Sequence, residues 1–324
     1  MAYKNYITKN KEDFFTVAFY NVENLFDTIN DPSILDDEFT PGTDKNWTKK
    51  RYDKKVFKLG TTLSNIGFKE TAKAPTIIGL AEVENIKVVT DLINSKHLVN
   101  KGYEAVHFDS PDERGIDVAL LYQKKFFEVT SKEQITLLID SQRGDRDFTR
   151  DILLVSGLLN GEKIHVLINH WPSRRSGADS TEYKRVAAAE KNREIIERIK
   201  AEEGEEAKVI VMGDFNDDPS SNSVRTLVDV DFYNPMEQLL TRSEGTTSYR
   251  GRWNLFDQII FSNNFHKYEK GKHSFAFSKI FNEDFLKVYR GRYKGQPFRT
   301  YAGGKYQGGY SDHFPVYMIL KHNK

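Results

Sequence analysis

The chain has 324 residues, of which 38% are hydrophobic and 29% are charged, and this composition is typical of a soluble globular protein. Lysine and arginine number 48 against 47 for aspartate and glutamate, so the net charge of +1 excludes a global basic field for nucleic acid. The apolar runs are too short to cross a bilayer, and the absence of cysteine excludes disulfides, thiolate metal ligands and cysteine nucleophiles.

The beginning of the chain indicates no targeting segment. Residues Met1 to Tyr6 lack a basic stretch followed by an apolar core, so no signal peptide is expected. A cytoplasmic protein is predicted, unless a leader was trimmed. The length suggests about two domains, but no linker or internal repeat divides the chain, and we predict a single domain over residues 1–324.

The predicted elements alternate between apolar runs and helical patterns. Runs of aromatic and β-branched residues predict strands over residues 14–20, 76–80, 116–122, 126–139, 151–159, 163–170, 209–212, 256–261 and 311–320. Apolar residues at helical spacing predict a helix that covers a sheet, namely Val56, Leu59, Leu63 and Ile66. Further helices are expected over 86–95 and near 220–228.

Two local signals refine these elements. Asn160-Gly161 separates two apolar runs, and this dipeptide is the strongest short-range signal for a β-hairpin. Asp179 followed by Glu182 resembles a capping box, so a long helix is expected to start there, with Val186, Ala189, Ile196 and Ile199 facing inward and its charged residues facing water.

The most informative stretch is Val209 to Asn216. Four apolar residues run into Gly213, Asp214, Phe215 and Asn216, which predicts a buried strand that delivers two oxygen-bearing side chains to a sheet edge. Strand alternation places Asp214 and Asn216 on one side of the chain. Taken alone, the same residues also fit a turn in which both side chains bond their own backbone.

Other strand boundaries carry the same kinds of residue. Strand ends hold Asn21, Glu82, His170, Asp214 and Asn216, and strand starts hold Asp117, Asp257, Asp312 and His313. In mixed or antiparallel sheets the ends of some strands and the starts of others lie along one rim. We therefore predict that all nine side chains share one edge, although any one alone is more often structural.

The residue types predict the chemistry. Oxygen ligands without thiolates suit Mg²⁺ or Mn²⁺, with Glu82 as the best ligand. Two histidines with Asp117 and Asp257 as orienting partners provide acid and base near neutral pH. The six other histidines are interpreted as structural: His97, His107, His165, His266, His273 and His322.

Four ordered motifs resemble the endonuclease/exonuclease/phosphatase superfamily. They are Tyr20-Asn21-Val22-Glu23-Asn24, Leu80-Ala81-Glu82-Val83, Gly213-Asp214-Phe215-Asn216 and Ser311-Asp312-His313. The resemblance spans residues 20 to 316 and implies an α/β (α+β) fold, a four-layer sandwich of two mixed β-sheets packed face to face with helices on the outer faces. His170 resembles the deoxyribonuclease branch, and the absence of a Cys-Asp-Arg signature argues against the inositol phosphatases.

The resemblance also implies a role for each residue. Glu82 would hold the metal, with support from Asn21 and Asp312. Asp214 would orient or deprotonate the attacking water, and Asn216 would hold a phosphate oxygen. His313, paired with Asp257, would contact the scissile phosphate. His170, paired with Asp117, would assist the leaving group or stabilise the transition state, and which histidine acts as the acid stays open.

These expectations predict a divalent-metal-dependent phosphodiesterase that acts on DNA or RNA. The alternative is a hydrolase of a small-molecule or lipid-headgroup phosphoester, which the near-zero net charge favours. A binding module that has lost catalysis is the third interpretation, and the complete set of nine residues argues against it. Oligomeric state stays open.

One further segment bears on the substrate. Leu286 to Lys305 contains six cations, interleaved with tyrosines and a phenylalanine, and no acidic residue. Because it directly precedes Asp312 and His313, the segment is expected beside the site, where cations would contact phosphates and rings would stack on bases. A solvated insertion with locally packed aromatic residues is the alternative.

Overall fold

A computed structural model describes residues 10–140, 144–175 and 177–324. The first nine residues, on which the expected absence of a signal peptide depends, lie outside this part of the chain. Among the helices of the described ranges, none combines the length and the apolar character needed to cross a membrane.

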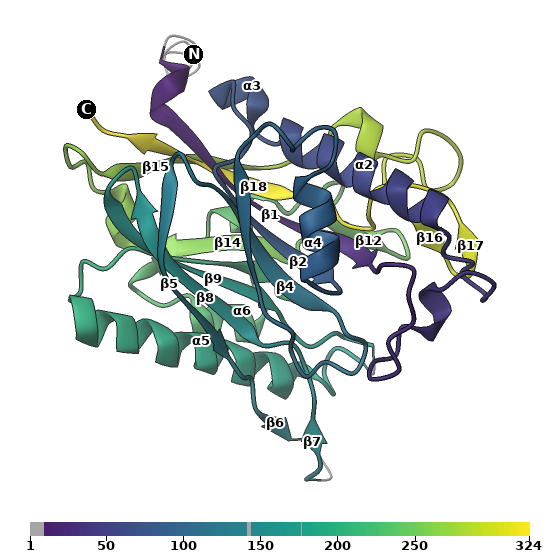
Figure 1. Cartoon of the computed structure of the whole chain (residues 1–324). Coiled ribbons are helices and arrows are strands. Elements are labelled where there is room, and N and C mark those ends of the chain that lie inside the picture. The colour runs from purple at the N-terminus through teal and green to yellow at the C-terminus, as the bar shows by residue number, and fades with distance from the viewer. Residues whose placement is uncertain (1–9, 141–143, 176) are drawn as a thin grey trace.

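Two six-stranded mixed sheets form the centre of the molecule (Figure 1). The first contains, in spatial order, β15 (His273–Ile280), β18 (Val316–His322), β1 (Phe14–Leu25), β2 (Ile77–Val83), β4 (Asp117–Gln123) and β3 (Tyr103–His107). The second contains β11 (Phe232–Tyr233), β14 (Asp257–Ser262), β10 (Val209–Asp214), β9 (Glu162–His170), β8 (Ile152–Leu159) and β5 (Phe127–Ile135). Each sheet has one parallel pair, β1 with β2 and β9 with β10, and its other pairs are antiparallel.

Helices cover the outer faces of both sheets (Figure 1). The first sheet carries α2 (Lys49–Asn65), α3 (Phe68–Thr71) and α4 (Ile86–Ile93), and the second carries α5 (Glu182–Glu203) and α6 (Asn222–Leu227). Shorter elements are η1 (Lys11–Asp13), η2 (Asp37–Phe39), η3 (Pro235–Leu239), η4 (Asn263–His266), η5 (Asp284–Leu286) and the ribbons β6 (Ile139–Asp140) with β7 (Arg146–Asp147), β12 (Thr247–Tyr249) with β13 (Arg252–Asn254), and β16 (Tyr301–Ala302) with β17 (Lys305–Tyr306).

Three buried apolar clusters fill the interfaces between the layers. Phe19 and Met212 belong to the cluster between the two sheets. Val211, the neighbour of Met212, points the other way and packs with Ile196 of α5, and Leu59 of α2 belongs to the cluster on the first sheet. Successive strand residues therefore serve opposite interfaces, which explains why the strand sequences are continuously apolar. The predicted four-layer sandwich is confirmed.

Local predictions were partly correct. Asn160 and Gly161 have φ of 47° and 89° and join β8 to β9, as the hairpin signal predicted. The predicted strand over 126–139 is instead interrupted after Ile135, where β5 ends. The expected capping box is wrong, because α5 begins after Thr181.

The inner face of α5 also differs from the expectation that its charges face water. Arg185 is buried, and its Nε donates to Asp217 Oδ2 at 2.6 Å. Asp217 also accepts from Arg174 Nε at 3.0 Å and from the Ser223 hydroxyl. This network holds the turn that follows β10, so it fixes the chain directly after Asp214.

We expect Arg185→Leu to lower the free energy of unfolding by about 3 kcal/mol, because the buried carboxylate of Asp217 loses a charged partner. Urea unfolding followed by circular dichroism measures this. Arg198→Leu on the same helix is the matched control. Its side chain is 44% exposed and pairs with Glu133, so less than about 1 kcal/mol should be lost. Equal losses in the two variants would contradict a structural role for the Arg185 pair.

Candidate active site

Three predicted site residues stand side by side in the second sheet. Asp214 is the last residue of β10, and its register partners are His170 on β9 and Asp257 on β14. Residues in register on neighbouring strands project to the same side of a sheet. Strand ends and a strand start therefore meet at one edge, as the sequence predicted.

The first sheet contributes Asn21 from β1 and Glu82 from β2. The β1/β2 ladder is regular up to Asn21 opposite Ala81 and then shifts register. Within this irregular stretch Glu23, Asn24 and Glu82 have φ of 53°, 51° and 65°. Such left-handed conformations are uncommon outside glycine and concentrate at functional sites, where a bulge re-aims side chains. Here they turn Glu82 and Asn24 toward each other.

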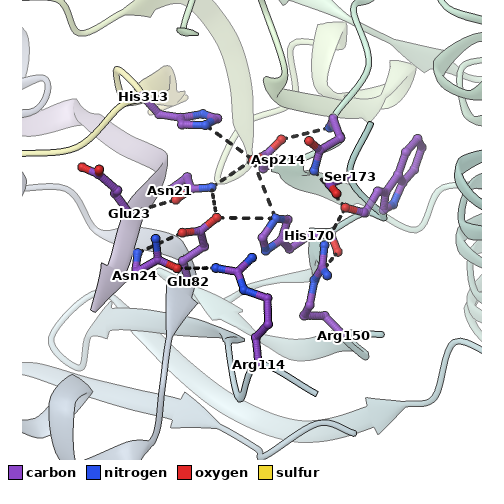
Figure 2. A network of polar contacts seen from close by, with 12 residues as sticks. Asn21, Glu23, Asn24, Glu82, Arg114, Arg150, His170, Ser173, Asp214 and His313 are labelled. Carbon is purple, nitrogen blue, oxygen red and sulfur yellow. Dashed lines mark hydrogen bonds and ion pairs between the residues drawn. The ribbon is translucent and has the colours of Figure 1, made fainter. Parts of the chain in front are cut away.

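Asn21 joins the two sheets through its side-chain amide (Figure 2). Its Nδ2 donates to Asp214 Oδ2 at 2.9 Å and to Glu82 Oε1 at 3.2 Å. Its Oδ1 accepts from the Glu23 backbone N–H at 2.9 Å. Glu82 Oε2 accepts from the Asn24 backbone N–H at 2.9 Å. Two carboxylates from opposite sheets thus converge on one amide nitrogen.

Two histidines flank this point. The Nε2 of His170 lies 3.8 Å from Asp214 Oδ2 and 3.9 Å from Glu82 Oε1, and the Nε2 of His313 lies 3.8 Å from Asp214 Oδ2 (Figure 2). His313 Nδ1 forms a 2.6 Å hydrogen bond with Asp257 Oδ2, so this expected pair is formed. The pair fixes the ring so that Nε2 faces Asp214.

The expected pair between His170 and Asp117 is wrong. Asp117 accepts from the Ser110 backbone N–H at 3.0 Å and from its hydroxyl, and it lies 3.3 Å from His107 Nε2. The reason is topological, because β4 belongs to the first sheet, where Asp117 stands opposite Val83. In the described parts of the chain the buried His170 Nδ1 has no hydrogen-bond partner.

The two remaining predicted residues, Asn216 and Asp312, contact the surroundings of this centre. Asn216 has φ of 50°, and its backbone N–H donates to Asp214 Oδ1 at 2.9 Å while its Nδ2 donates to the Trp171 carbonyl at 2.9 Å. Asp312 accepts a 2.5 Å hydrogen bond from Arg299 Nη2. Burial opposes ionisation of Asp312, but the positive charges of His313 and Arg299 outweigh it and lower the pKa.

Burial and neighbouring charges shift the pKa values of the two histidines in opposite directions. Burial lowers the pKa of His170 well below its usual value, and the positive charges of Arg150 and Arg114 act in the same direction. Burial also disfavours the charged form of His313, but Asp257 and Asp214 outweigh it and raise the pKa well above its usual value. Near neutral pH, His170 is therefore neutral and His313 is an imidazolium.

The pKa of Asp214 is raised as well. Burial is the main cause, the charge on His313 opposes the shift, and the negative charge of Asp257 adds to it. A carboxyl group with a raised pKa is a stronger base than an ordinary aspartate.

Sequence reasoning missed two arginines of the site. The exposed Arg114 donates from Nη2 to Asn24 Oδ1. The buried Arg150 donates to the carbonyls of His170 at 3.2 Å and Trp171 at 2.7 Å. Both precede strands, Arg114 just before β4 and Arg150 just before β8. A polar residue just before a strand is the same positional signal that identified the acids and histidines, and it also identifies these two arginines.

The donor set fits a hard divalent cation. The carboxylates of Glu82 and Asp214 approach the same amide nitrogen, and carboxylate and carboxamide oxygens are the ligands that Mg²⁺ and Mn²⁺ prefer. Asp214, Asp257 and His313 also form a group whose ligand atoms lie within 4.8 Å of one another. In that group, however, Asp257 and His313 already bond each other through Oδ2 and Nδ1.

Fold and site together define an α/β sandwich whose centre is suited to hydrolysis of phosphoesters. The profile of the Endonuclease/Exonuclease/phosphatase family matches residues 16–322, and the chain belongs to this family. Membership places it among hydrolases of phosphoester bonds, a family that is generally dependent on divalent metal. A search of curated proteins found no match.

Solved structures share the fold at low sequence identity. A humanized TDP2 from D. rerio is 16% identical with a TM-score of 0.58, and the match covers 95% of this chain and 99% of that one. A mannosyl-6-phosphatase from Bacteroides thetaiotaomicron is 15% identical with a TM-score of 0.55 and coverage of 94% and 99%. The human Nocturnin catalytic domain with bound sulfate is 15% identical with a TM-score of 0.58 and coverage of 95% and 93%. At these identities the likeness shows the fold alone.

We expect the two histidines to titrate far apart in the metal-free protein. Imidazole NMR signals, assigned with His170→Gln and His313→Gln, should show a protonated His313 and a neutral His170 near neutral pH. A raised folded-state pKa adds stability below the unfolded value of about 6.5 that is lost as pH rises through the folded value. His313→Gln should therefore cost more stability at about pH 6 than at about pH 9. Loss of the His313 proton below about pH 6.5 would contradict the assignment.

Proposed function

We propose that this protein is a divalent-metal-dependent phosphodiesterase and that its substrate is nucleic acid, DNA or RNA. The observation that carries the proposal is the position of Asp214. Its Oδ2 bonds Asn21 and lies 3.8 Å from the Nε2 of both a neutral and a charged histidine. In this proposal residues 1–324 act as one domain, which the three apolar clusters between the layers support.

Mg²⁺ or Mn²⁺ would be held mainly by Glu82, with Asn21 offering its carbonyl oxygen and Asp312 at the border of the site. The second lone pair of the Asn21 carbonyl is available beside the bond from Glu23. When bound, the cation would stabilise negative charge on the phosphoryl oxygens. The ion is inferred from the donor set and the family.

The chain's own residues would divide the remaining work. Asp214, with its raised pKa, accepts a proton from the attacking water and orients it. The positive charge of His313 stabilises the phosphate, and its proton is transferred to the leaving oxygen. Asp257 holds the His313 ring in place. His170 contacts the substrate as a neutral ring, and the second N–H of the Asn216 amide binds a phosphate oxygen.

Two observations support nucleic acid as the substrate. The exposed guanidinium of Arg114 bonds the side chain of Asn24, and the backbone N–H of Asn24 bonds Glu82. From this position Arg114 can contact the phosphate next to the scissile one. A solved D. rerio TDP2 with this fold, 16% identical, is complexed with a single-strand DNA product. That complex comes from a distant relative, so the substrate is our proposal for this chain.

A small phosphoester is the second candidate, and a pocket beside the centre favours it. The pocket has a volume of about 160 Å³ and is lined by Glu23, Asn24, Lys45, Arg299 and Asp312, together with two aromatic rings. Such a mixture of charges, amide and rings suits a small hydroxylated group. The mannosyl-6-phosphatase with the same fold acts on a ligand of that kind, as its name states.

We expect Asp214→Asn to lower the turnover number by about 10²- to 10⁴-fold with little change in thermal stability, because general-base catalysis is lost. Turnover would be measured with Mg²⁺ on plasmid DNA, RNA, sphingomyelin, sugar and inositol phosphates, and bis(p-nitrophenyl) phosphate. Asp117→Asn is the matched control, since it makes the same change at another buried strand boundary. It should keep most of the activity, and an equal loss would return Asp117 to the site.

Glu82→Gln should weaken Mn²⁺ binding by at least about 10-fold, because one carboxylate of an oxygen site is replaced by a neutral amide. Isothermal titration calorimetry of the parent and the variant measures this directly. Glu84→Gln, two residues further along the same chain, is the matched control and should bind Mn²⁺ like the parent. Unchanged affinity in Glu82→Gln would contradict its assignment as the metal carboxylate.

A further inference from the structure

Two segments concentrate positive charge in a chain whose net charge is only +1. Helix α2 holds six lysines and arginines and one acid, Asp53. Residues 286–310 hold six more and no acid. If the two segments lie together, they form a local concentration of positive charge for a polyanion that the net charge of the whole chain does not reveal.

Contacts between rings and cations join the two segments. Lys58 Nζ lies 4.3 Å from the ring centre of Tyr310 and donates to the Gly308 carbonyl at 2.6 Å. The Arg51 guanidinium lies 4.2 Å from the ring centre of Tyr306. Figure 1 shows β16 and β17 beside α2. These contacts place residues 306–310 against α2, so the two segments contribute to one surface of the molecule.

Six cations on this surface are exposed and unneutralised. Within the described ranges none of them forms an ion pair with an acidic residue: Lys50, Lys54, Arg290, Arg292, Lys294 and Lys305. These six residues define the basic surface. Burial, the charge of Lys54 on this surface and the charge of the neighbouring Lys55 lower the pKa of Lys58 to about 8.

Exposed aromatic rings accompany the cations on a hairpin. The bonds from Val288 N–H to the Gln296 carbonyl, at 2.8 Å, and from Gly295 N–H to the Val288 carbonyl, at 3.0 Å, close it. At its tip Tyr289 is 87% exposed and Tyr293 is 57% exposed. The alternative, in which the aromatic residues of this segment pack locally, therefore does not describe these two exposed rings. Exposed tyrosines between cations are the features that bind unpaired bases and their phosphates.

The segment that carries the basic surface also reaches the active site. The Thr300 backbone N–H donates to Glu23 Oε2 at 2.6 Å, and Arg299 bonds Asp312. Elsewhere around the site is a cavity of about 830 Å³. Its described lining residues include six acids and no lysine or arginine: Asp31, Glu84, Asp109, Asp112, Glu113 and Asp117. Phosphates are attracted to the basic surface and repelled from this cavity.

We propose that the basic surface and the hairpin tyrosines bind one single strand of nucleic acid and lead it to the active site from the side of α2. The six cations contact its phosphates, and Tyr289 and Tyr293 stack on its bases. Stacking requires bases that are not paired, so the strand is single rather than duplex. The proposal rests on the proposed function for its substrate class.

Binding without catalysis tests the proposal. Fluorescence anisotropy in EDTA would measure the affinity of the full chain for a labelled 20-nucleotide DNA or RNA strand over a range of salt. Replacing Arg290, Arg292 and Lys294 by alanine should reduce the slope of log affinity against log salt by roughly 0.7 per lost contact, about 2 in total. The matched control replaces Lys125, Lys270 and Lys272, three exposed cations at the opposite end of the sheets, and should keep the parent slope.

A second pair of variants tests the rings. Tyr289→Ala and Tyr293→Ala should each weaken single-strand binding by on the order of 10-fold and leave duplex binding nearly unchanged. Equal slopes for the two triple variants, or tighter binding of duplex than of single strand, would overturn the proposal. An anionic membrane surface is the competing partner, and sedimentation with phosphatidylserine vesicles tests it. Binding to vesicles without binding to oligonucleotides would also overturn the proposal.

Hydrolysis of bis(p-nitrophenyl) phosphate keeps the two proposals separate. A protein that cleaves this small diester but shows no salt-dependent strand binding would refute the basic surface alone. A protein that binds the strand as expected but hydrolyses no phosphodiester would refute the proposed function and leave the binding surface in place.

Discussion

The site depends on one hydrogen bond between the two sheets. Asn21 Nδ2 on β1 donates to Asp214 Oδ2 on β10 at 2.9 Å, across 193 residues of sequence. Because the same amide group also bonds Glu82, the two carboxylates are held at one point rather than repelled into solvent. The apolar cluster between the sheets brings these strand ends close, and the amide then sets their relative position.

The two histidines around this point are kept in different protonation states, and both have little contact with water. His170 is kept neutral by burial and by two arginines, while His313 is kept charged by Asp257 and Asp214. A site with a proton donor, a neutral ring and a basic carboxyl group can serve both halves of a hydrolysis. The left-handed conformations of Glu82 and Asn216 accompany this arrangement, as strained backbone often does at functional sites.

Positive and negative side chains are segregated around the site, although the net charge of the chain is only +1. Cations of α2 and of residues 286–310 lie in one region, and six acids line the large cavity elsewhere around the site. The buried carboxylate of Asp217 has a different role, because Arg185 and Arg174 hold the turn after Asp214 through it. Under our proposal exposed charge selects the substrate, whereas the geometry of the centre depends on buried charge.

The sequence alone predicted most strands and the edge shared by Asn21, Glu82 and Asp214, because apolar runs of strand length and polar residues at their boundaries are local patterns. The four layers and the His313–Asp257 pair were expected from the resemblance of its motifs to a known family. Only the tertiary structure decided that Asp117 belongs with Ser110 and His107, since the sheet to which a strand belongs is set by long-range packing. It also decided that Arg114 reaches Asn24 and that α2 lies against residues 298–310, because contacts between distant segments leave no local pattern.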